Sequence, residues 1–192
     1  MRSAYIQLRT SADAYMYPGH VSTMTGMGVY RELARDYGIS GAVTGFTASE
    51  ILTALATIIV KLGEGKPFAE NCYPRVVTEE GSRPSREIVG RVMEPCDAEW
   101  RGLGVIPDSG MRLRDEFSGY DARKKFQIPK MTAKGSPGCR GGEMLLGEIK
   151  PYDCPLYGRA CTPEHPVGAC MVSGEGTCSA YYKYGSLELI RK

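Results

Sequence analysis

The chain has 192 residues and a formal net charge of +2, and 42% of its residues are apolar. That length fits one large domain or a domain with an appendage, and the apolar fraction is that of an ordinary globular protein. Basic and acidic residues are interleaved, so nucleic-acid binding is not expected. The N-terminal residues lack a signal-peptide core and no apolar stretch is long enough to span a membrane, so we expect a cytoplasmic protein with reduced thiols and no membrane partner.

The first notable segment, Pro18-Gly19-His20-Val21-Ser22-Thr23-Met24-Thr25-Gly26, is expected to form a polar turn that leads into a helix. It places one of only two histidines beside hydroxyl side chains, and open α/β sheets bind ligands at loops of this kind. A structural interpretation competes with the functional one. In it, Ser22 or Thr25 caps the helix and backbone groups satisfy His20, because a lone histidine needs partners for acid-base chemistry.

Regular elements follow. Residues 28–37 are expected to form a short helix and residues 39–43 a short buried strand. Thr47 and Glu50 have the spacing of a capping box, and Gly63 is placed to end the helix that the box begins. Inside that helix the apolar residues form one wide stripe, made of Ile51, Leu52, Leu55, Ile58, Ile59 and Leu62.

The alternation continues to about residue 128. A helix is expected from Pro84 to Met93, with Pro84 in its first turn and a buried face of Ile88, Val89 and Val92. Residues 103–106 suggest another strand, and residues 111–126 have helical character. The predicted fold class is α/β, a mainly parallel sheet layered with helices. After residue 128 the composition turns to Gly, Pro and Cys, so we predict an α/β domain at 1–128 and a cysteine-rich region at 129–192.

The cysteine-rich region contains Cys139, Cys154, Cys161 and Cys178, with the spacing C-x14-C-x6-C-x16-C. Thiolates are soft ligands, and four that converge suit an iron-sulfur cluster or a structural zinc. The region also has few large aliphatic residues, so a metal would serve as its core. Structural zinc sites draw their ligands as close pairs, and no such pair exists here. The spacing therefore favours a cluster and leaves zinc open, whereas disulfides suit a secreted chain and an even number of cysteines.

Three stretches carry a family resemblance: PGHVSTMTG at 18–26, EPCDAEWRGLGVIPDSG at 94–110, and KPYDCPLYGRACTPEHPVGACMVSGEGTCSAYYKYG at 150–185. Together they resemble the HypD family of hydrogenase maturation proteins, from about Asp13 to Gly185. The resemblance implies α/β domains and a 4Fe-4S cluster bound by the cysteine pattern above. Residues 18–26 match the family motif P-x-H-V-S-x-x-x-G, which is thought to face a cleft. His20 and Ser22 thereby become candidate catalytic residues, and Pro18, Val21 and Gly26 candidate binding residues.

The resemblance also implies partners. Members of the family act with HypC as a scaffold for the Fe(CN)2CO unit of nickel-iron hydrogenases, and HypE delivers the cyanide. The iron of that unit would be a transient cargo, and a 4Fe-4S centre would supply single electrons at low potential. A redox-active assembly scaffold is therefore expected rather than a free-standing enzyme. A thiol-disulfide oxidoreductase using Cys154, Cys161 or Cys170 and a zinc-stapled interaction module are the alternatives.

Two departures from the family pattern matter. Family members are roughly twice this length, and their N-terminal half carries Cys-Gly-x-His and Gly-Pro-Gly-Cys-Pro-Val-Cys motifs, neither of which is present here. The chain resembles the C-terminal half only. We therefore expect either a fragment of a family member or one half of a split protein, and in the second case a separate N-terminal half is a partner. The family also often has Cys-x-Cys-Gly where this chain has Cys139-Arg140-Gly141-Gly142. Cys170 is expected to lie outside the ligand set, and Cys72 and Cys96 to be buried thiols without a metal.

Overall fold

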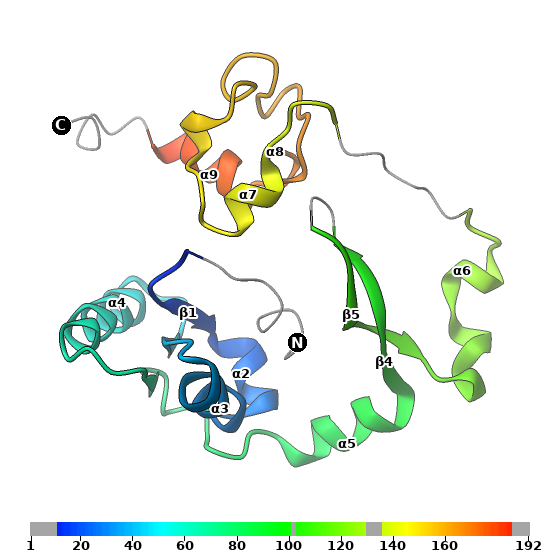
Figure 1. The fold of residues 1–192 in the computed structure, drawn as a ribbon. Helices are drawn as coiled ribbons and strands as arrows, with labels where there is room; N and C mark the ends of the chain where they lie inside the picture. The colour runs from blue at the N-terminus through cyan, green and yellow to red at the C-terminus, as the bar shows by residue number, and fades with distance from the viewer. Residues whose placement is uncertain (1–10, 101–102, 130–135, 186–192) are drawn as a thin grey trace.

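In the computed structural model, which describes residues 11–100, 103–129 and 136–185, the N-terminal part is a layered α/β structure (Figure 1). Its sheet has three parallel strands in the order β1-β2-β3. The strands are Tyr15–Pro18, Gly41–Thr44 and Ala69–Asn71. The central strand β2 is buried along its whole length, as a parallel strand covered on both faces must be. The predicted α/β class with a parallel sheet is confirmed for this part of the chain.

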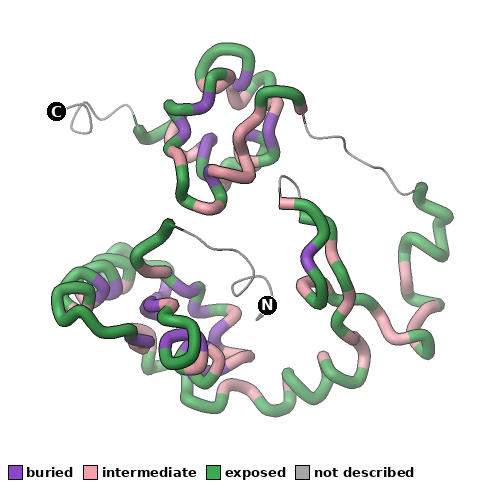
Figure 2. Tube along the Cα trace, in the orientation of Figure 1, coloured by how far each residue is buried: buried purple, intermediate pink, exposed green. Residues whose placement is uncertain are grey.

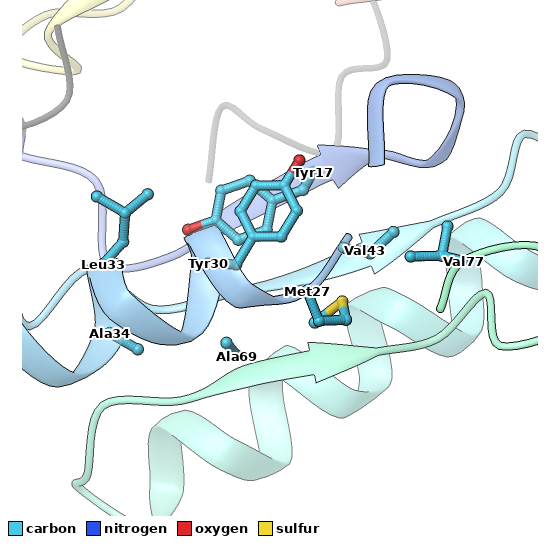
Figure 3. Close-up of a cluster of buried hydrophobic side chains, with 8 residues drawn as sticks. All are labelled: Tyr17, Met27, Tyr30, Leu33, Ala34, Val43, Ala69 and Val77. Carbon is cyan, nitrogen blue, oxygen red and sulfur yellow. The ribbon is translucent and has the colours of Figure 1, made fainter. Parts of the chain in front are cut away.

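Helices cover the two faces of this sheet. Because successive side chains of a strand alternate between faces, Val43 of β2 packs toward helix α3 (Gly28–Tyr37) and Ala42 toward helix α4 (Ala48–Gly63). On the α3 face, Tyr17 stacks on Tyr30 with ring centroids 4.0 Å apart, and Figure 3 shows the cluster around this pair. The rest of that cluster is Met27, Leu33, Ala34, Val43, Ala69 and Val77. The α4 face has a smaller core of Ala42, Ala54, Ile58 and Phe68.

Local sequence signals set the ends of both helices. The predicted helix at 28–37 is confirmed; Gly38 ends it with a positive φ of 70° and an amide that bonds to carbonyls of the last turn. The capping box of α4 is also confirmed. The Thr47 hydroxyl accepts from the Glu50 amide, and the Thr47 amide donates to the Glu50 carboxylate at 3.0 Å.

The apolar stripe of α4 is less buried than a stripe of this width usually is. Only Ile58 is buried; the other five residues are at least 40% exposed, and Leu52 and Ile59 are 64% and 63% exposed. Figure 2 shows green along most of this helix. A three-stranded sheet covers only one flank of a helix, so the described residues leave much of the stripe uncovered.

Residues 18–26 do not form the predicted turn. They contain helix α2 (Gly19–Thr25), which begins after Pro18 in an extended conformation and ends at Gly26, whose φ is 74°. Inside α2 the hydroxyls of Thr23 and Thr25 donate to the carbonyls of His20 and Val21. The polar side chains that suggested a turn are thus satisfied within a helix.

The next segment departs most from expectation. Helix α5 (Arg83–Val92) has the predicted proline in its first turn, but its predicted buried face is wrong, because none of its residues is buried. It leads into an antiparallel hairpin of β4 (Met93–Trp100) and β5 (Gly104–Leu113), outside the parallel sheet. Residues 111–113 continue β5 because they pair with residues 93–95, which overrides their helical character. Short helices η1 (Asp115–Tyr120) and α6 (Ala122–Lys125) follow.

The cysteine-rich region is built from short helices and tight turns. Its helices are α7 (Gly141–Leu145), η2 (Pro151–Asp153), α8 (Ala169–Val172) and α9 (Thr177–Tyr184). A hydrogen bond of 2.8 Å from the Ser11 amide to the Leu146 carbonyl joins it to the chain that enters β1. The predicted boundary near residue 128 adjoins residues 130–135, outside the described ranges, and stays a prediction. No helix within the described residues has both the length and the apolarity needed to cross a bilayer.

Candidate functional site

Five cysteines of the C-terminal region line one small cavity of about 20 Å³. They are the four of the predicted ligand set together with Cys170. The remaining lining residues are apolar or small, apart from Tyr157: Gly141, Met144, Leu156, Gly168 and Met171. Among the described side chains that line this cavity, sulfur is therefore the metal-binding atom on offer, apart from one phenol oxygen.

Four separate segments bring the four thiols of the predicted ligand set together. Cys139 precedes α7, Cys154 follows η2, and Cys178 lies in the first turn of α9. Cys161 is held by a tight turn in which its amide donates to the Leu156 carbonyl at 2.9 Å and its carbonyl accepts from the Gly158 amide at 3.0 Å. Gly158 has a φ of +66°, which a glycine adopts without strain.

Backbone groups approach two of the sulfurs closely. The Val167 amide donates to Cys161 Sγ at 3.4 Å. A Cβ built on the next residue, Gly168, would lie 2.6 Å from Cys139 Sγ, so a side chain there would force that sulfur or the backbone beside it to shift. Such amide-to-sulfur bonds and close backbone contacts are what tune a sulfur-ligated cluster.

The cavity disfavours a negatively charged thiolate unless a cation is bound beside it. Burial, and after it the neighbouring Cys170 and Cys161, raise the pKa of Cys178 to about 12. The thiol is therefore protonated at neutral pH, and a metal that binds it must displace the proton.

The donor set, sulfur atoms in an apolar lining, has the chemistry that an iron-sulfur cluster would need. Among the described residues, no three His, Cys, Asp or Glu side chains stand close enough to hold a metal ion. A cluster spreads its ligands round a larger body, and a pocket lined mainly by thiols and apolar side chains suits one chemically. The cavity would have to widen to admit it. All seven cysteines are free of disulfide bonds.

Cys170 lies closer to the ligand set than the sequence indicated. It lines the cavity and also an adjoining depression of about 190 Å³, whose wall includes Cys139, Arg140 and Glu143. Cys139 and Cys170 are thus the two thiols that border both spaces. Cys72 and Cys96 lie elsewhere: the Cys72 thiol bonds to the Thr57 hydroxyl at 3.5 Å, and Cys96 sits in β4.

His20 lies at the carboxyl edge of the parallel sheet, far along the sequence from the thiols. It is exposed in the first turn of α2, directly after β1, and its ring stands 5.2 Å from that of Phe46, which follows β2. Open α/β sheets bind ligands at this edge. Phe46 was not among the sequence candidates, although its place two residues after a buried strand could have marked it.

Three other residues of the 18–26 motif, Ser22, Gly26 and Pro18, have structural roles at α2. Ser22 is fully buried and bonds to the Tyr30 hydroxyl and the Pro18 carbonyl, both at 2.9 Å. Gly26 is buried, and its positive φ and close backbone neighbours in residues 79–81 exclude a side chain. Pro18 is the residue before the helix. Among the proposed cleft residues, therefore, His20 is the one with an exposed functional group.

An ion pair that the sequence analysis did not predict stabilises the same edge of the sheet. Arg75, which follows β3, bonds to the Glu50 carboxylate at 2.5 Å and lies over the Tyr73 ring at 4.8 Å. The bond to Arg75, followed by those to Thr47, lowers the pKa of Glu50 to about 2. Glu50 thereby links the start of α4 to the loop after β3. His165 is exposed near Thr162 and does not line the thiol cavity.

Comparison with known proteins places the chain in a family. The HypD model, described as hydrogenase formation hypA family, matches residues 1–185. The hydrogenase maturation factor HypD of Azotobacter vinelandii is 37% identical over 174 residues, 90% of this chain and 46% of that protein. A putative hydrogenase expression/formation protein of Methanocaldococcus jannaschii is 41% identical over 172 residues, 90% of this chain and 48% of that protein. The chain spans about half the length of these relatives, and it belongs to the HypD family of hydrogenase maturation factors.

Proposed function

We propose that this chain is the cluster-bearing half of a scaffold that matures nickel-iron hydrogenases. In this role Cys139, Cys154, Cys161 and Cys178 hold a 4Fe-4S cluster. The observation that carries the proposal is the convergence of thiols from four segments on one apolar cavity. The chain's membership of a hydrogenase maturation family is consistent with it.

The residues around the thiols have distinct tasks in this proposal. The cluster, when bound, supplies single electrons at low potential. Val167 holds Cys161 through its amide, and Gly168 leaves the space for Cys139. Met144 and Met171 are buried against the thiols and keep water from them. Cys170 stands beside the ligand set as a thiol without a metal bond.

The assembly step itself requires other polypeptides. We propose a HypC-like chaperone and a HypE-like cyanide donor as partners, in the cytoplasm, together with the N-terminal half of the family fold. The Fe(CN)2CO unit would be the cargo, and His20 at the carboxyl edge would face it. This chain alone would not complete the unit, because it spans about half of the relatives' length.

Metal analysis of anaerobically purified protein tests the cofactor. We expect iron and sulfide in equal amounts, little zinc, and a broad absorption in the visible blue. Replacing any one of the four ligands with alanine should abolish that absorption, whereas Cys72→Ala, Cys96→Ala and Cys170→Ala should keep it. Stoichiometric zinc without iron would instead support the zinc-stapled module. If Cys170→Ala loses the absorption and an alanine variant of one of the four predicted ligands keeps it, Cys170 is a ligand and that residue is not.

Complementation tests the assembly role separately. In cells that lack HypD, this chain alone should not restore hydrogenase activity, and co-expression with the N-terminal half of a relative should restore it. Activity from this chain alone would contradict the division of labour between the two halves.

A further inference from the structure

Helix α4 exposes an apolar face that its own domain does not cover. The face consists of Ile51, Leu52, Leu55, Ile59 and Leu62, each at least 40% exposed. These residues lie within about a third of the helix circumference, next to the buried flank of Ala54 and Ile58. A helix that is apolar over so wide an arc is normally covered on more than one side.

The face also lacks charged side chains and free hydroxyl groups, which water would solvate. No residue from 51 to 60 is charged. The two polar side chains in that stretch, Thr53 and Thr57, donate their hydroxyls back to the carbonyls of Ser49 and Thr53, at 2.8 and 2.9 Å. Charged residues occur only towards the ends of the helix, at Glu50 and Lys61. The result is an apolar centre with a charged rim, the composition of a protein interface.

The uncovered surface continues onto the sheet. Met16 of β1 pairs in register with Ala42 of β2, so both side chains point to the α4 side. Ala42 is fully buried under α4, whereas Met16 is 40% exposed. Phe46, which lies between β2 and α4 and is 61% exposed, adds apolar surface at the carboxyl edge, where its ring meets that of His20. An occupant of the α4 face would therefore also border the edge that carries His20.

The length of the relatives indicates what the occupant is. The match covers 46% to 48% of the length of two relatives that are 37% to 41% identical to the chain. More than half of each relative therefore lies outside the match. A membrane surface fits poorly, because the helix carries one basic residue, Lys61, and interfacial helices are rich in them. An uncharged face needs a partner surface that is itself apolar.

We propose that the α4 face is the docking surface for the half of the family polypeptide that these 192 residues do not span. Docking there buries Leu52 and Ile59 at its centre and brings the second half beside His20. The docking surface goes beyond the proposed function, because it depends on α4 and family length and not on the thiols. Evidence against the cluster would therefore not count against the docking surface.

A binding measurement tests the docking surface. The probe is a polypeptide made of the part of the Azotobacter vinelandii relative that lies outside the match, titrated against this chain by calorimetry. Leu52→Lys/Ile59→Lys should bind at least about tenfold more weakly than the unsubstituted chain, because a charge at the centre of an apolar interface stays unpaired. The matched control is Thr53→Lys, exposed on the same helix but off the face, which should bind as the unsubstituted chain does.

Several results would overturn the docking surface. One is equal affinity of the double variant and the control; another is absence of binding by the unsubstituted chain. A third is a dimer of this chain that the double variant converts to a monomer, because the occupant would then be a second copy. Circular dichroism melting of each variant tests whether the fold is retained, and we expect that it is, because the substituted residues are mostly exposed. Normal docking with failed complementation would refute the assembly role and leave the docking surface intact.

Discussion

Gly168 leaves the space that the Cys139 sulfur occupies: a Cβ at residue 168 would lie 2.6 Å from that atom. The φ of Gly168 is −98°, a value open to any residue, so the requirement for glycine is one of space and not of backbone conformation. The same sulfur has a second glycine neighbour, Gly141, whose built Cβ would lie 3.5 Å away, an ordinary contact.

Substitution with alanine should therefore disturb the cluster at Gly168 and leave it unchanged at Gly141. Gly168→Ala must displace either Cys139 or α8, so we expect loss of most of the cluster absorption and destabilisation of about 1–3 kcal/mol. Gly141→Ala should keep the absorption. Visible spectra and iron content per folded protein are the measurements. Full cluster content in Gly168→Ala would show that Cys139 is not held where the cluster binds.

Ser22 should prove to be a stability residue. Ser22→Ala removes its bonds to the Pro18 carbonyl and the Tyr30 hydroxyl and leaves that hydroxyl unsatisfied inside the core. We expect a loss of about 1–3 kcal/mol in urea unfolding. Thr23→Ala, which removes the neighbouring exposed hydroxyl, is the control and should cost less than about 1 kcal/mol. Unchanged stability with lost assembly would return Ser22 to a cleft role.

His20, in contrast to Ser22, should matter for assembly and not for stability. Its side chain is exposed and meets only the exposed Phe46 ring among the described contacts, so His20→Ala should leave the melting temperature and the cluster spectrum nearly unchanged. In reconstitution with an N-terminal half, transfer of the iron unit to the hydrogenase precursor should fall strongly. A large drop in stability with transfer preserved per folded molecule would make His20 a structural residue.

The Glu50 ion pair should make folding acid-sensitive. Its pKa is lowered to about 2 in the folded state, chiefly by Arg75, whereas a carboxyl of an unfolded chain titrates near about 4.3. The folded state thus favours the ionised form, so its contribution is complete above about pH 4.3 and is lost as the pH falls towards 2. Glu50→Gln should destabilise the protein at pH 7 and change its stability less between pH 4.3 and 2.

Arg75→Gln is the control for that pH profile. It removes the main cause of the lowered pKa and keeps the capping box of α4, so its acid dependence should fall between those of the unsubstituted chain and Glu50→Gln. Unfolding followed by circular dichroism over this pH range gives all three curves. Parallel curves for the unsubstituted chain and Glu50→Gln would place the acid sensitivity elsewhere.

Short-range signals made several features readable from the sequence alone. The capping box at Thr47 and Glu50, the positions that end α3 and α4, and the proline that opens α5 depend on groups within four residues of one another. Helical hydrogen bonds and caps span the same distance, so a local pattern is enough to predict them. The family was readable for a similar reason, because its motifs are continuous stretches of chain.

Contacts between distant residues were decided only by the tertiary structure. The sequence did not indicate strands β1 and β3, which are three or four residues long and owe their existence to pairing with β2. Residues 111–113 became a strand because residues 93–95 pair with them. Cys170 joined the thiol cavity because α8 folds back on α9. Most of the α4 stripe stayed exposed, since periodicity shows which side of a helix is apolar but not how much of that side its neighbours can cover.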